Sequence, residues 1–270
     1  MEFEYPADGV GKPRDVLIKT PADISKVRPL DIENAVLGTP GGERTKQRIE
    51  SVRKMAAQAG QSHSVLGWAE GPLAEYADLR GVESAMLDLI DKPEMFVEAG
   101  EVIIQNEISF ALAQIKAGAD MIGIGDAVAG LIAPDMYKEY ILPLEQKLFA
   151  AIHEAGAAVK LHICGNIKNH IAYMAQSGAD IIDVDWMVPL DQARELVGPE
   201  ITLCGNFDPS AVLLRGSPED VAEAARECLK AGGDKFILMP GCEVPPATPE
   251  ENIRAFCPCD GCLIREELKC

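Results

Sequence analysis

Three stretches of the sequence share one pattern: QIKAGADMIGIGD at residues 114–126, MAQSGADIIDVDW at residues 174–186 and CLKAGGDKFILMPGC at residues 228–242. Each begins as a helical pattern that stops at Gly-Ala-Asp or Gly-Gly-Asp, because glycine readily adopts the left-handed conformation that ends a helix. A short aliphatic run follows and ends in a polar or glycine-containing loop, as a buried parallel strand does. The repeated pattern predicts units in which helices and strands alternate.

Three further runs predict strands of the same kind, at residues 63–72 (HSVLGWAEGP), 157–166 (AAVKLHICGN) and 200–209 (EITLCGNFDP). The six strands alternate with expected helices such as those at residues 134–155, 189–197 and 218–231, which predicts a parallel sheet covered by helices. A TIM-type (β/α)8 barrel is the α/β fold that we expect, because its active site lies at the C-terminal strand ends. Those ends carry many reactive side chains: Glu70, Asp126, His162, Cys164, Asp185, Asn206, Asp208 and Cys242. An open doubly wound sheet is the alternative, but no Gly-x-Gly-x-x-Gly turn supports a dinucleotide site.

The beginning of the chain does not supply all eight strands of a barrel. Before residue 60 the sequence offers only RDVLIKTP at residues 14–21 and a helical pattern at residues 41–60. We therefore expect a barrel whose first strand-helix units are irregular or absent. The expected organisation is an irregular N-terminal segment at residues 1–60, a barrel domain at residues 61–256 and a cysteine-rich tail at residues 257–270.

Composition limits the partners of the protein. The chain has 270 residues, 47% of them hydrophobic, and a formal net charge of -18. Such a charge disfavours binding to nucleic acid or to an anionic membrane surface, because both repel an acidic protein. No apolar run reaches the roughly 18 residues of a membrane helix, and the acidic N-terminus is unlike a signal peptide. We expect a soluble cytoplasmic protein that binds neither nucleic acid nor membrane.

A candidate metal site follows from three soft ligands. His162 and Cys164 lie two residues apart on a strand, so their side chains point to the same face. Cys242 lies at another strand end, after Gly241, which allows a sharp turn. One histidine and two cysteines form a known catalytic zinc set with an open fourth position. Spacing alone leaves a second interpretation open, in which these residues belong to the core.

Between Gly67 and Phe256 the chain resembles the uroporphyrinogen decarboxylase superfamily, and within it the corrinoid-dependent methyltransferases that include the methylcobalamin:coenzyme M enzymes. The resemblance rests on matching stretches in family order: GWAEGPLAEYADLRG (67–81), AGADMIGIGDAVAGLIAPDMYKEYILPLEQKL (117–148), VKLHICGN (159–166), GADIIDVDW (178–186), CGNFDPSAVLLRGSPEDV (204–221) and GGDKFILMPGCEVPPATPEENIRAF (232–256).

The resemblance implies a TIM-type barrel and a zinc-dependent methyltransferase. It implies that His162, Cys164 and Cys242 hold Zn²⁺, and that methylcobalamin on a corrinoid protein donates a methyl group to a thiol such as coenzyme M. Zinc makes the acceptor thiolate available near neutral pH, and two thiolate ligands keep that sulfur electron-rich. Two alternatives are a tetrapyrrole decarboxylase, which would need a basic pocket and no metal, and a noncatalytic corrinoid-binding subunit.

Four other strand-end residues are weaker candidates. Asp185 and Asp126 are expected to be catalytic, Asp185 as a fourth zinc ligand or as an acceptor for the imidazole N–H. Asn206 and Asp208 are expected to bind the cofactor. Each has an alternative role as a helix cap or turn former.

The remaining cysteines fall into two groups. Cys257, Cys259, Cys262 and Cys270 form a Cys-x-Cys-x2-Cys pattern with a fourth cysteine, which suits either a second metal site or an unstructured tail. Cys204 and Cys228 lie in apolar surroundings and are expected in the core.

Overall fold

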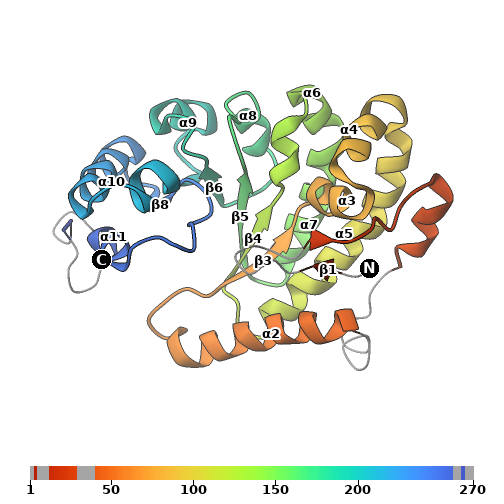
Figure 1. The fold of residues 1–270 in the computed structure, drawn as a ribbon, viewed down its shortest axis with the longest axis horizontal. Helices are drawn as coiled ribbons and strands as arrows, with labels where there is room; N and C mark the ends of the chain where they lie inside the picture. The colour runs from red at the N-terminus through yellow and green to blue at the C-terminus, as the bar shows by residue number, and fades with distance from the viewer. Residues whose placement is uncertain (1–2, 5–11, 29–39, 258–262, 265–270) are drawn as a thin grey trace. The chain divides into compact units, whose positions relative to one another are not determined.

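The computed structural model describes residues 3–4, 12–28, 40–257 and 263–264. Within these residues one sheet contains six parallel strands that alternate with helices, in the order β3-β4-β5-β6-β7-β8 (Figure 1). The strands lie where the sequence predicts them: β3 Leu66–Glu70, β4 Met121–Gly125, β5 Ala158–Ile163, β6 Ile181–Val184, β7 Thr202–Phe207 and β8 Phe236–Pro240. The expected α/β class is confirmed, and the strands in this part of the chain correspond to a partial TIM-type barrel with six parallel strands rather than eight.

The turns that precede three of these strands have the predicted geometry. Their glycines all have positive φ angles, 110° at Gly118, 93° at Gly178 and 75° at Gly233. The aspartate of the turn also contacts the neighbouring strand: Asp120 accepts a hydrogen bond from the backbone N–H of Val65, and Asp180 accepts one from Val159, each at 2.7 Å. These glycines therefore turn the chain just before β4, β6 and β8, and Asp120 and Asp180 each align the start of an adjacent strand.

Contacts divide the chain into two compact units, which are described separately. The first comprises Met1–Leu161 and Gln176–Asp180, and the second His162–Ala175 and Ile181–Cys270. The chain passes from the first unit to the second within β5. The expected boundaries at residues 60 and 256 stay predictions.

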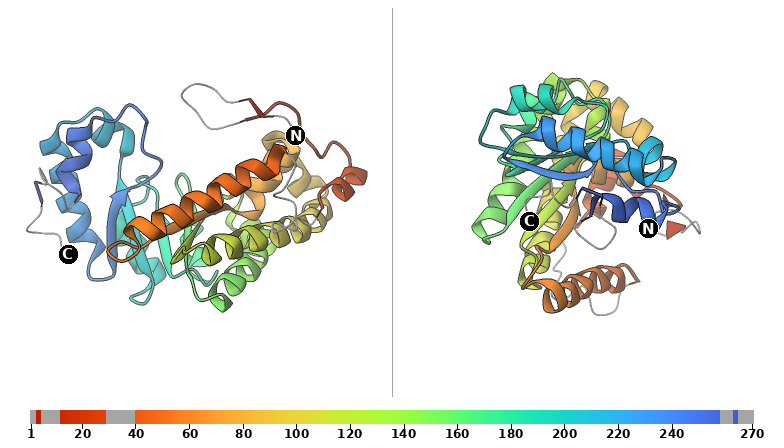
Figure 2. Two further views of the ribbon diagram at one scale, coloured as in Figure 1. Left: turned by 90° about the horizontal axis from the view of Figure 1, so that it is seen from below. Right: turned by 90° about the vertical axis from the view of Figure 1, so that its left-hand side faces the viewer.

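In the first unit, β3 and β4 pair in parallel from Leu66 opposite Met121 to Glu70 opposite Gly125. The long helices α2 and α5 lie side by side (Figure 2). Of these two, α2 is Pro40–Ala59 and α5 is Pro93–Lys116. The unit also contains an antiparallel pair, β1 Phe3–Glu4 and β2 Lys12–Pro13, and the shorter helical elements η1 Pro21–Lys26, α3 Pro72–Arg80, α4 Val82–Asp91 and η2 Ala127–Leu131. No helix in the described ranges is both long and apolar enough to cross a membrane.

The helix expected at residues 134–155 is interrupted. It consists of α6 (Pro134–Met136), a π-helical turn η3 (Tyr137–Ile141) and α7 (Leu142–Glu154). Pro143 stands in the first turn of α7 and has no backbone N–H to donate to the preceding turn. Just before this proline the backbone hydrogen bonds therefore change from the α-helical to the wider π-helical spacing, which is usual for a single π-helical turn inside a longer helix.

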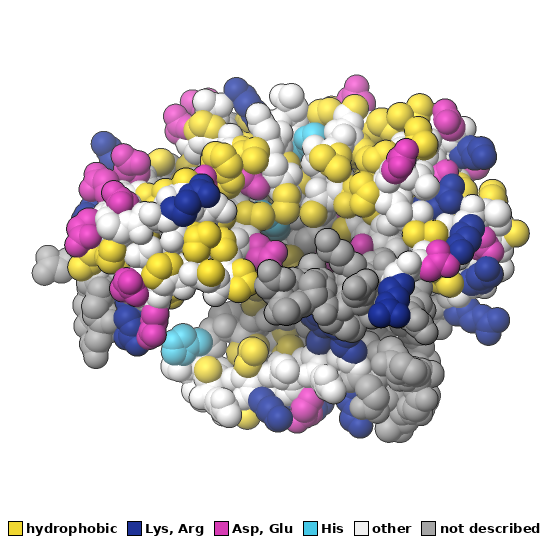
Figure 3. All heavy atoms as spheres, in the orientation of Figure 1, with side chains coloured by type: hydrophobic (Ala, Val, Ile, Leu, Met, Phe, Trp, Pro, Cys, Tyr) yellow, Lys and Arg dark blue, Asp and Glu magenta, His cyan; other side chains and the backbone are white. Residues whose placement is uncertain are grey.

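The second unit contains β6, β7 and β8 in parallel register, with Asp183 opposite Cys204 and Cys204 opposite Ile237. Its helical elements are α8 Ile171–Met174, α9 Leu190–Val197, η4 Pro209–Leu214, α10 Pro218–Gly232 and α11 Glu250–Phe256. Ser217 and Asp220 form a capping box at the start of α10, which packs on β7, β8 and α11. The buried face of α10 includes Cys228, whereas its outer face is acidic (Figure 3).

Candidate metal centre

The end of β5 places two soft ligands on one face. His162 is 7% exposed and Cys164 is half-buried, and alternation along the strand aims both side chains the same way. The Nε2 atom of His162 lies 3.2 Å from Sγ of Cys164. The predicted pairing of these two residues is therefore present in the structure.

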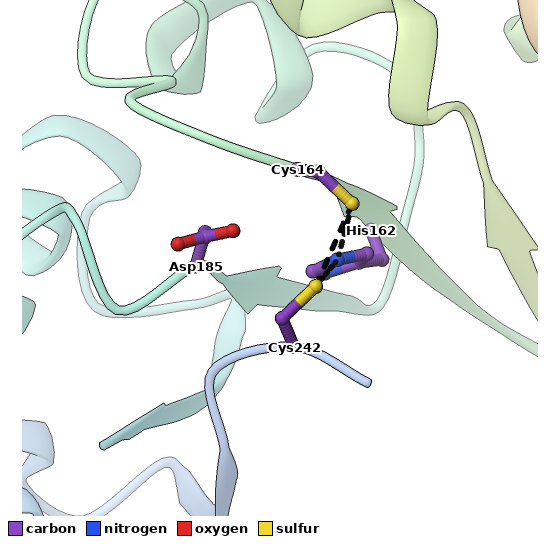
Figure 4. Close-up of side chains that lie close together, drawn as sticks. All are labelled: His162, Cys164, Asp185 and Cys242. Carbon is purple, nitrogen blue, oxygen red and sulfur yellow. Dashed lines mark hydrogen bonds between the residues drawn. The ribbon is translucent and has the colours of Figure 1, made fainter. Parts of the chain in front are cut away.

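Cys242 joins this pair from the loop after β8 (Figure 4). Its Sγ lies 3.7 Å from Sγ of Cys164 and 3.7 Å from Nε2 of His162. Gly241 permits this approach, because a β-carbon there would lie 2.5 Å from the backbone nitrogen of Trp186. Because Gly241 has no side chain, the loop after β8 can pack closely against the loop after β6.

Asp185, directly after β6, completes a group of four. One ligand atom from each of His162, Cys164, Asp185 and Cys242 lies within 4.8 Å of the others. Figure 4 shows Asp185 to one side of the other three. Its buried carboxylate accepts hydrogen bonds from the backbone N–H of Gly165 at 2.8 Å and of Met187 at 3.1 Å. Asp185 therefore also ties the loop after β5 to the loop after β6.

The imidazole of His162 is oriented by a residue that the sequence did not single out. Nδ1 of His162 lies 3.3 Å from the backbone oxygen of Asp183 and 3.5 Å from its carboxylate. A proton on Nδ1 leaves Nε2 free to face the two sulfurs. Strand alternation in the sequence could have identified Asp183, because it places Asp183 and Asp185 on the same face of β6 and of the residues that follow it.

The three soft ligands form a strongly coupled set. Burial lowers the pKa of His162, but its contacts with Asp183 and Cys242 outweigh burial and raise the pKa to about 10. Hydrogen bonds from Cys164 and His162 lower the pKa of Cys242 to about 4. The contact with Cys242 in turn raises the pKa of the Cys164 thiol above its ordinary value. Ligands of this kind lose their protons when a metal cation binds.

The two expected cofactor-binding residues lie in the same unit and make structural contacts. The side-chain amide of Asn206 donates to the backbone oxygens of Asp185 at 3.3 Å and Val188 at 2.6 Å. Asp208 caps η4 by accepting hydrogen bonds from the N–H groups of Ser210 and Ala211. Asn206 therefore supports the loop that carries Asp185, and a cofactor-binding role for either residue stays a prediction.

Asp126 belongs to the first unit and is fully buried. Its carboxylate accepts hydrogen bonds from Leu73 and Ala74 in the first turn of α3. Burial raises its pKa to about 7 even though these hydrogen bonds oppose the shift. Asp126, which directly follows β4, thus caps the N-terminus of α3. Its predicted catalytic role stays a prediction.

The structure bears on only part of the cysteine pattern in the tail. Cys257 is half-buried at the end of α11, whereas Cys259, Cys262 and Cys270 lie outside the described residues. Cys204 and Cys228 are buried, which confirms that they are core residues.

Comparisons with known proteins place the chain in one family. A family model described as uroporphyrinogen decarboxylase (URO-D) matches residues 1–259. A methylcobamide:CoM methyltransferase of Methanosarcina barkeri is 30% identical over 211 residues, which cover 77% of this chain and 61% of the relative. A uroporphyrinogen decarboxylase of Streptomyces avermitilis is 28% identical over 253 residues, which cover 91% of this chain and 67% of the relative.

A solved structure shows the same fold. A methyltransferase from Methanosarcina mazei superposes with a TM-score of 0.79 at 26% identity, covering 94% of this chain and 73% of that chain. The chain spans about three fifths (61%) of the length of the Methanosarcina barkeri relative. Because the family model extends over nearly all of the sequence, the chain belongs to the uroporphyrinogen decarboxylase (URO-D) family.

Proposed function

We propose that the protein is a zinc-dependent methyltransferase, which moves a methyl group from a methylated corrinoid to a thiol acceptor such as coenzyme M. The observation that carries the proposal is the convergence of His162, Cys164 and Cys242 with Asp185 at the C-terminal ends of three parallel strands, β5, β6 and β8. In barrels of this type the strand ends supply the catalytic groups. The names of the similar Methanosarcina proteins support the same activity.

The distances within the site suit zinc. A tetrahedral ion with Zn–S distances of about 2.3 Å and a Zn–N distance of about 2.1 Å separates two sulfurs by about 3.8 Å, and nitrogen from sulfur by about 3.6 Å. The corresponding distances here are 3.7 Å between the sulfurs, and 3.2 Å and 3.7 Å from Nε2 of His162 to the sulfurs of Cys164 and Cys242. The residues present therefore fit the ion, with His162, Cys164 and Cys242 as its ligands.

Bound zinc would act as a Lewis acid that keeps the sulfur of the acceptor deprotonated at neutral pH. The chain's own residues set up this chemistry. Cys164 and Cys242 supply two negative charges, so little net positive charge remains to withdraw electrons from the acceptor sulfur. Asp183 holds His162 in the orientation that directs Nε2 toward the site.

Asp185 lies close to the three soft ligands, so its carboxylate would be available as a fourth zinc ligand. Its hydrogen bonds to the backbone N–H groups of Gly165 and Met187 would keep it beside the site. An Asp185→Asn variant is expected to keep one of these two hydrogen bonds through its amide oxygen and to weaken metal binding. Its zinc affinity, measured by competition with a chelator, tests this role.

The proposal is tested by metal analysis of the purified protein together with Cys242→Ala, Cys164→Ala and a matched control, Cys204→Ala. Cys204 is a buried cysteine on β7 that contributes to the core. We expect about one zinc per chain in the unmodified protein and the control, and loss of zinc in the other two variants. Methyl transfer from methylcobalamin to coenzyme M should follow zinc content. Full turnover in the Cys242→Ala protein without zinc would defeat the proposal.

A tetrapyrrole decarboxylase is the second candidate, because decarboxylases are among the similar proteins. That reaction would need cationic groups for several substrate carboxylates and no soft metal ligands. Release of CO2 from uroporphyrinogen, undiminished by Cys242→Ala, would favour this function over methyl transfer.

A further inference from the structure

The free edge of β3, the first strand of the six-stranded sheet, is closed by side chains of α5. The backbone carbonyl of Val65 hydrogen-bonds toward β4, so alternation along the strand turns the backbone groups of Trp68 and Glu70 away from β4. The side-chain amide of Gln114 accepts from the N–H of Trp68 at 3.0 Å and donates to its carbonyl at 2.9 Å. The carboxylate of Glu107 accepts from the N–H of Glu70. Another strand therefore cannot pair with β3 at these residues unless it displaces both side chains.

The free edge of β8, the last strand of the same sheet, is open. The backbone carbonyl of Lys235 accepts a hydrogen bond from Leu203 on β7, so alternation turns the N–H and C=O groups of Phe236 and Leu238 away from β7. Among the described residues, none hydrogen-bonds to these outward groups. A row of unpaired backbone groups at a sheet edge is a template for another strand.

The side chains of β8 are also poorly covered. Ile237, in the middle of the strand, is 43% exposed. Phe236 and Leu238 on one face and Met239 on the other are half-buried. Strands of parallel sheets are normally buried on both faces. The strand carries no charged residue from Phe236 to Pro240, so it lacks the charges that commonly protect an edge strand from pairing.

We propose that two copies of the chain associate through their β8 edges, as an antiparallel strand pair centred on Ile237. A two-fold axis at Ile237 places Phe236 of one copy opposite Leu238 of the other. Both residues direct N–H and C=O outward, so each such pair exchanges hydrogen bonds in both directions. Ile237 then faces Ile237 of the second copy at a position without hydrogen bonds, where opposing side chains come closest.

Pro240 selects this register over the neighbouring one. Proline has no N–H to donate. An axis at Leu238 would set Pro240 opposite Phe236, and each of those pairs would lose one of its two hydrogen bonds. An axis at Ile237 keeps Pro240 outside the central pairs, opposite Asp234, where its carbonyl still accepts. The register centred on Ile237 therefore uses the outward donors and acceptors of β8 most fully.

A second copy is the occupant that the two edges favour. An antiparallel pair about a two-fold axis is self-complementary, so the same edge supplies donors and acceptors in matching order. A head-to-tail contact of β8 with β3 of another copy would extend into filaments. Gln114 and Glu107 occupy the edge of β3, which disfavours that contact. Association through β8 therefore closes at a dimer.

Sedimentation of the full chain tests the dimer. A contact of this size belongs with weak interfaces, so we expect a Kd on the order of 10 µM. The formal net charge of -18 on each copy opposes association, so added salt should lower the Kd. Ile237→Lys should raise the Kd about tenfold or more, because it sets two like charges opposite each other. The matched control, Leu196→Lys on α9, alters a side chain that is 41% exposed and should leave the Kd unchanged.

The inference does not depend on the proposed function, and its failure leaves that function untouched. A monomer up to about 200 µM, well above the expected Kd, would overturn the inference. So would a dimer of the same Kd in Ile237→Lys, since another surface would then form it. Circular dichroism checks that each variant is folded.

Cross-linking tests the register separately. Opposing β-carbons at the centre of the pair lie about 4.5–5.5 Å apart, which is near disulfide geometry. With oxidised glutathione as the oxidant, Ile237→Cys should form a disulfide-linked dimer, and mass spectrometry of its peptides should identify residue 237 on both sides of the bond. Leu196→Cys is the control and should cross-link far more slowly. Equal rates in the two variants would overturn the pairing of β8 with its copy.

Discussion

Nδ1 of His162 lies 3.3 Å from the backbone oxygen of Asp183, and the carboxylate of Asp183 stands 3.5 Å from the same nitrogen. These two acceptors fix which imidazole nitrogen carries the proton and which faces the sulfurs. Outer partners of this kind raise the basicity of a ligating histidine. The candidate site is therefore defined by four ligand residues and by the residue that orients the first of them.

Replacing Asp183 by asparagine should weaken zinc binding without unfolding the protein. The backbone oxygen remains as an acceptor, but the negative charge near the imidazole is lost, so we expect zinc affinity to fall about tenfold. Competition with a chromogenic chelator measures the affinity, and circular dichroism checks the fold. An affinity equal to that of the unmodified protein would show that the carboxylate has no part in tuning His162.

Replacing Asn206 by alanine should destabilise the loop that carries Asp185. The change removes two donated hydrogen bonds and leaves the backbone oxygens of Asp185 and Val188 without that partner, which costs about 2 kcal/mol of unfolding free energy. Urea denaturation measures the loss. Asn166→Ala, at an exposed position, is the control and should change stability little. Equal stabilities of the two variants would contradict the structural role of Asn206.

Replacing Gly241 by alanine should displace Cys242. The added β-carbon would lie 2.5 Å from a backbone nitrogen, so rotation of a side chain cannot relieve the clash. We expect lower zinc affinity together with a loss of about 1–3 kcal/mol in unfolding free energy. Gly198→Ala is the control, because its glycine has a φ of 78° but nothing within 4 Å of the added carbon. That variant should lose about 1–2 kcal/mol through backbone strain while its zinc affinity stays unchanged.

Buried carboxyl groups in the first unit should make the protein less stable as pH rises. Burial raises the pKa of Asp126 and of Glu75 to about 7, and raises that of Glu145 above its ordinary value. The folded state then holds protons that the unfolded state has released, so stability falls as pH rises from about 4.5 through 7. Other charged or titratable groups that interact with this cluster are Arg48, Glu70, Asp78, Glu107 and Tyr137.

A Glu145→Gln variant tests this pH dependence. Glu145 is fully buried on α7, where its carboxylate accepts a hydrogen bond from Tyr137. A neutral amide removes one group that must lose its proton, so the drop in Tm between pH 5.5 and pH 8 should shrink by about 3 °C or more. Glu154→Gln, at an exposed position at the end of the same helix, should leave that drop unchanged. An identical drop in both variants would count against a proton held at Glu145.

The sequence by itself determined the secondary structure and half of the candidate site. Strands and helix ends depend on local patterns, so the glycine turns at Gly118, Gly178 and Gly233 and the buried runs after them could be placed without tertiary information. The pairing of His162 with Cys164 is also local, because two residues apart on a strand always share a face. The π-helical turn at Tyr137–Ile141 could not be predicted in the same way. The helical apolar pattern continues unbroken through Pro143, so the pattern by itself predicts one continuous helix.

Only the tertiary structure decided which distant residues meet. Cys242 is 78 residues beyond Cys164 along the chain, and their contact depends on strand order, register and the missing side chain at Gly241. The same applies to Asp183 beside His162 and to Asn206 beneath the loop of Asp185. Burial of Asp126 and Glu145 likewise follows from packing. Such contacts arise between elements that are far apart in sequence, and no local periodicity encodes them.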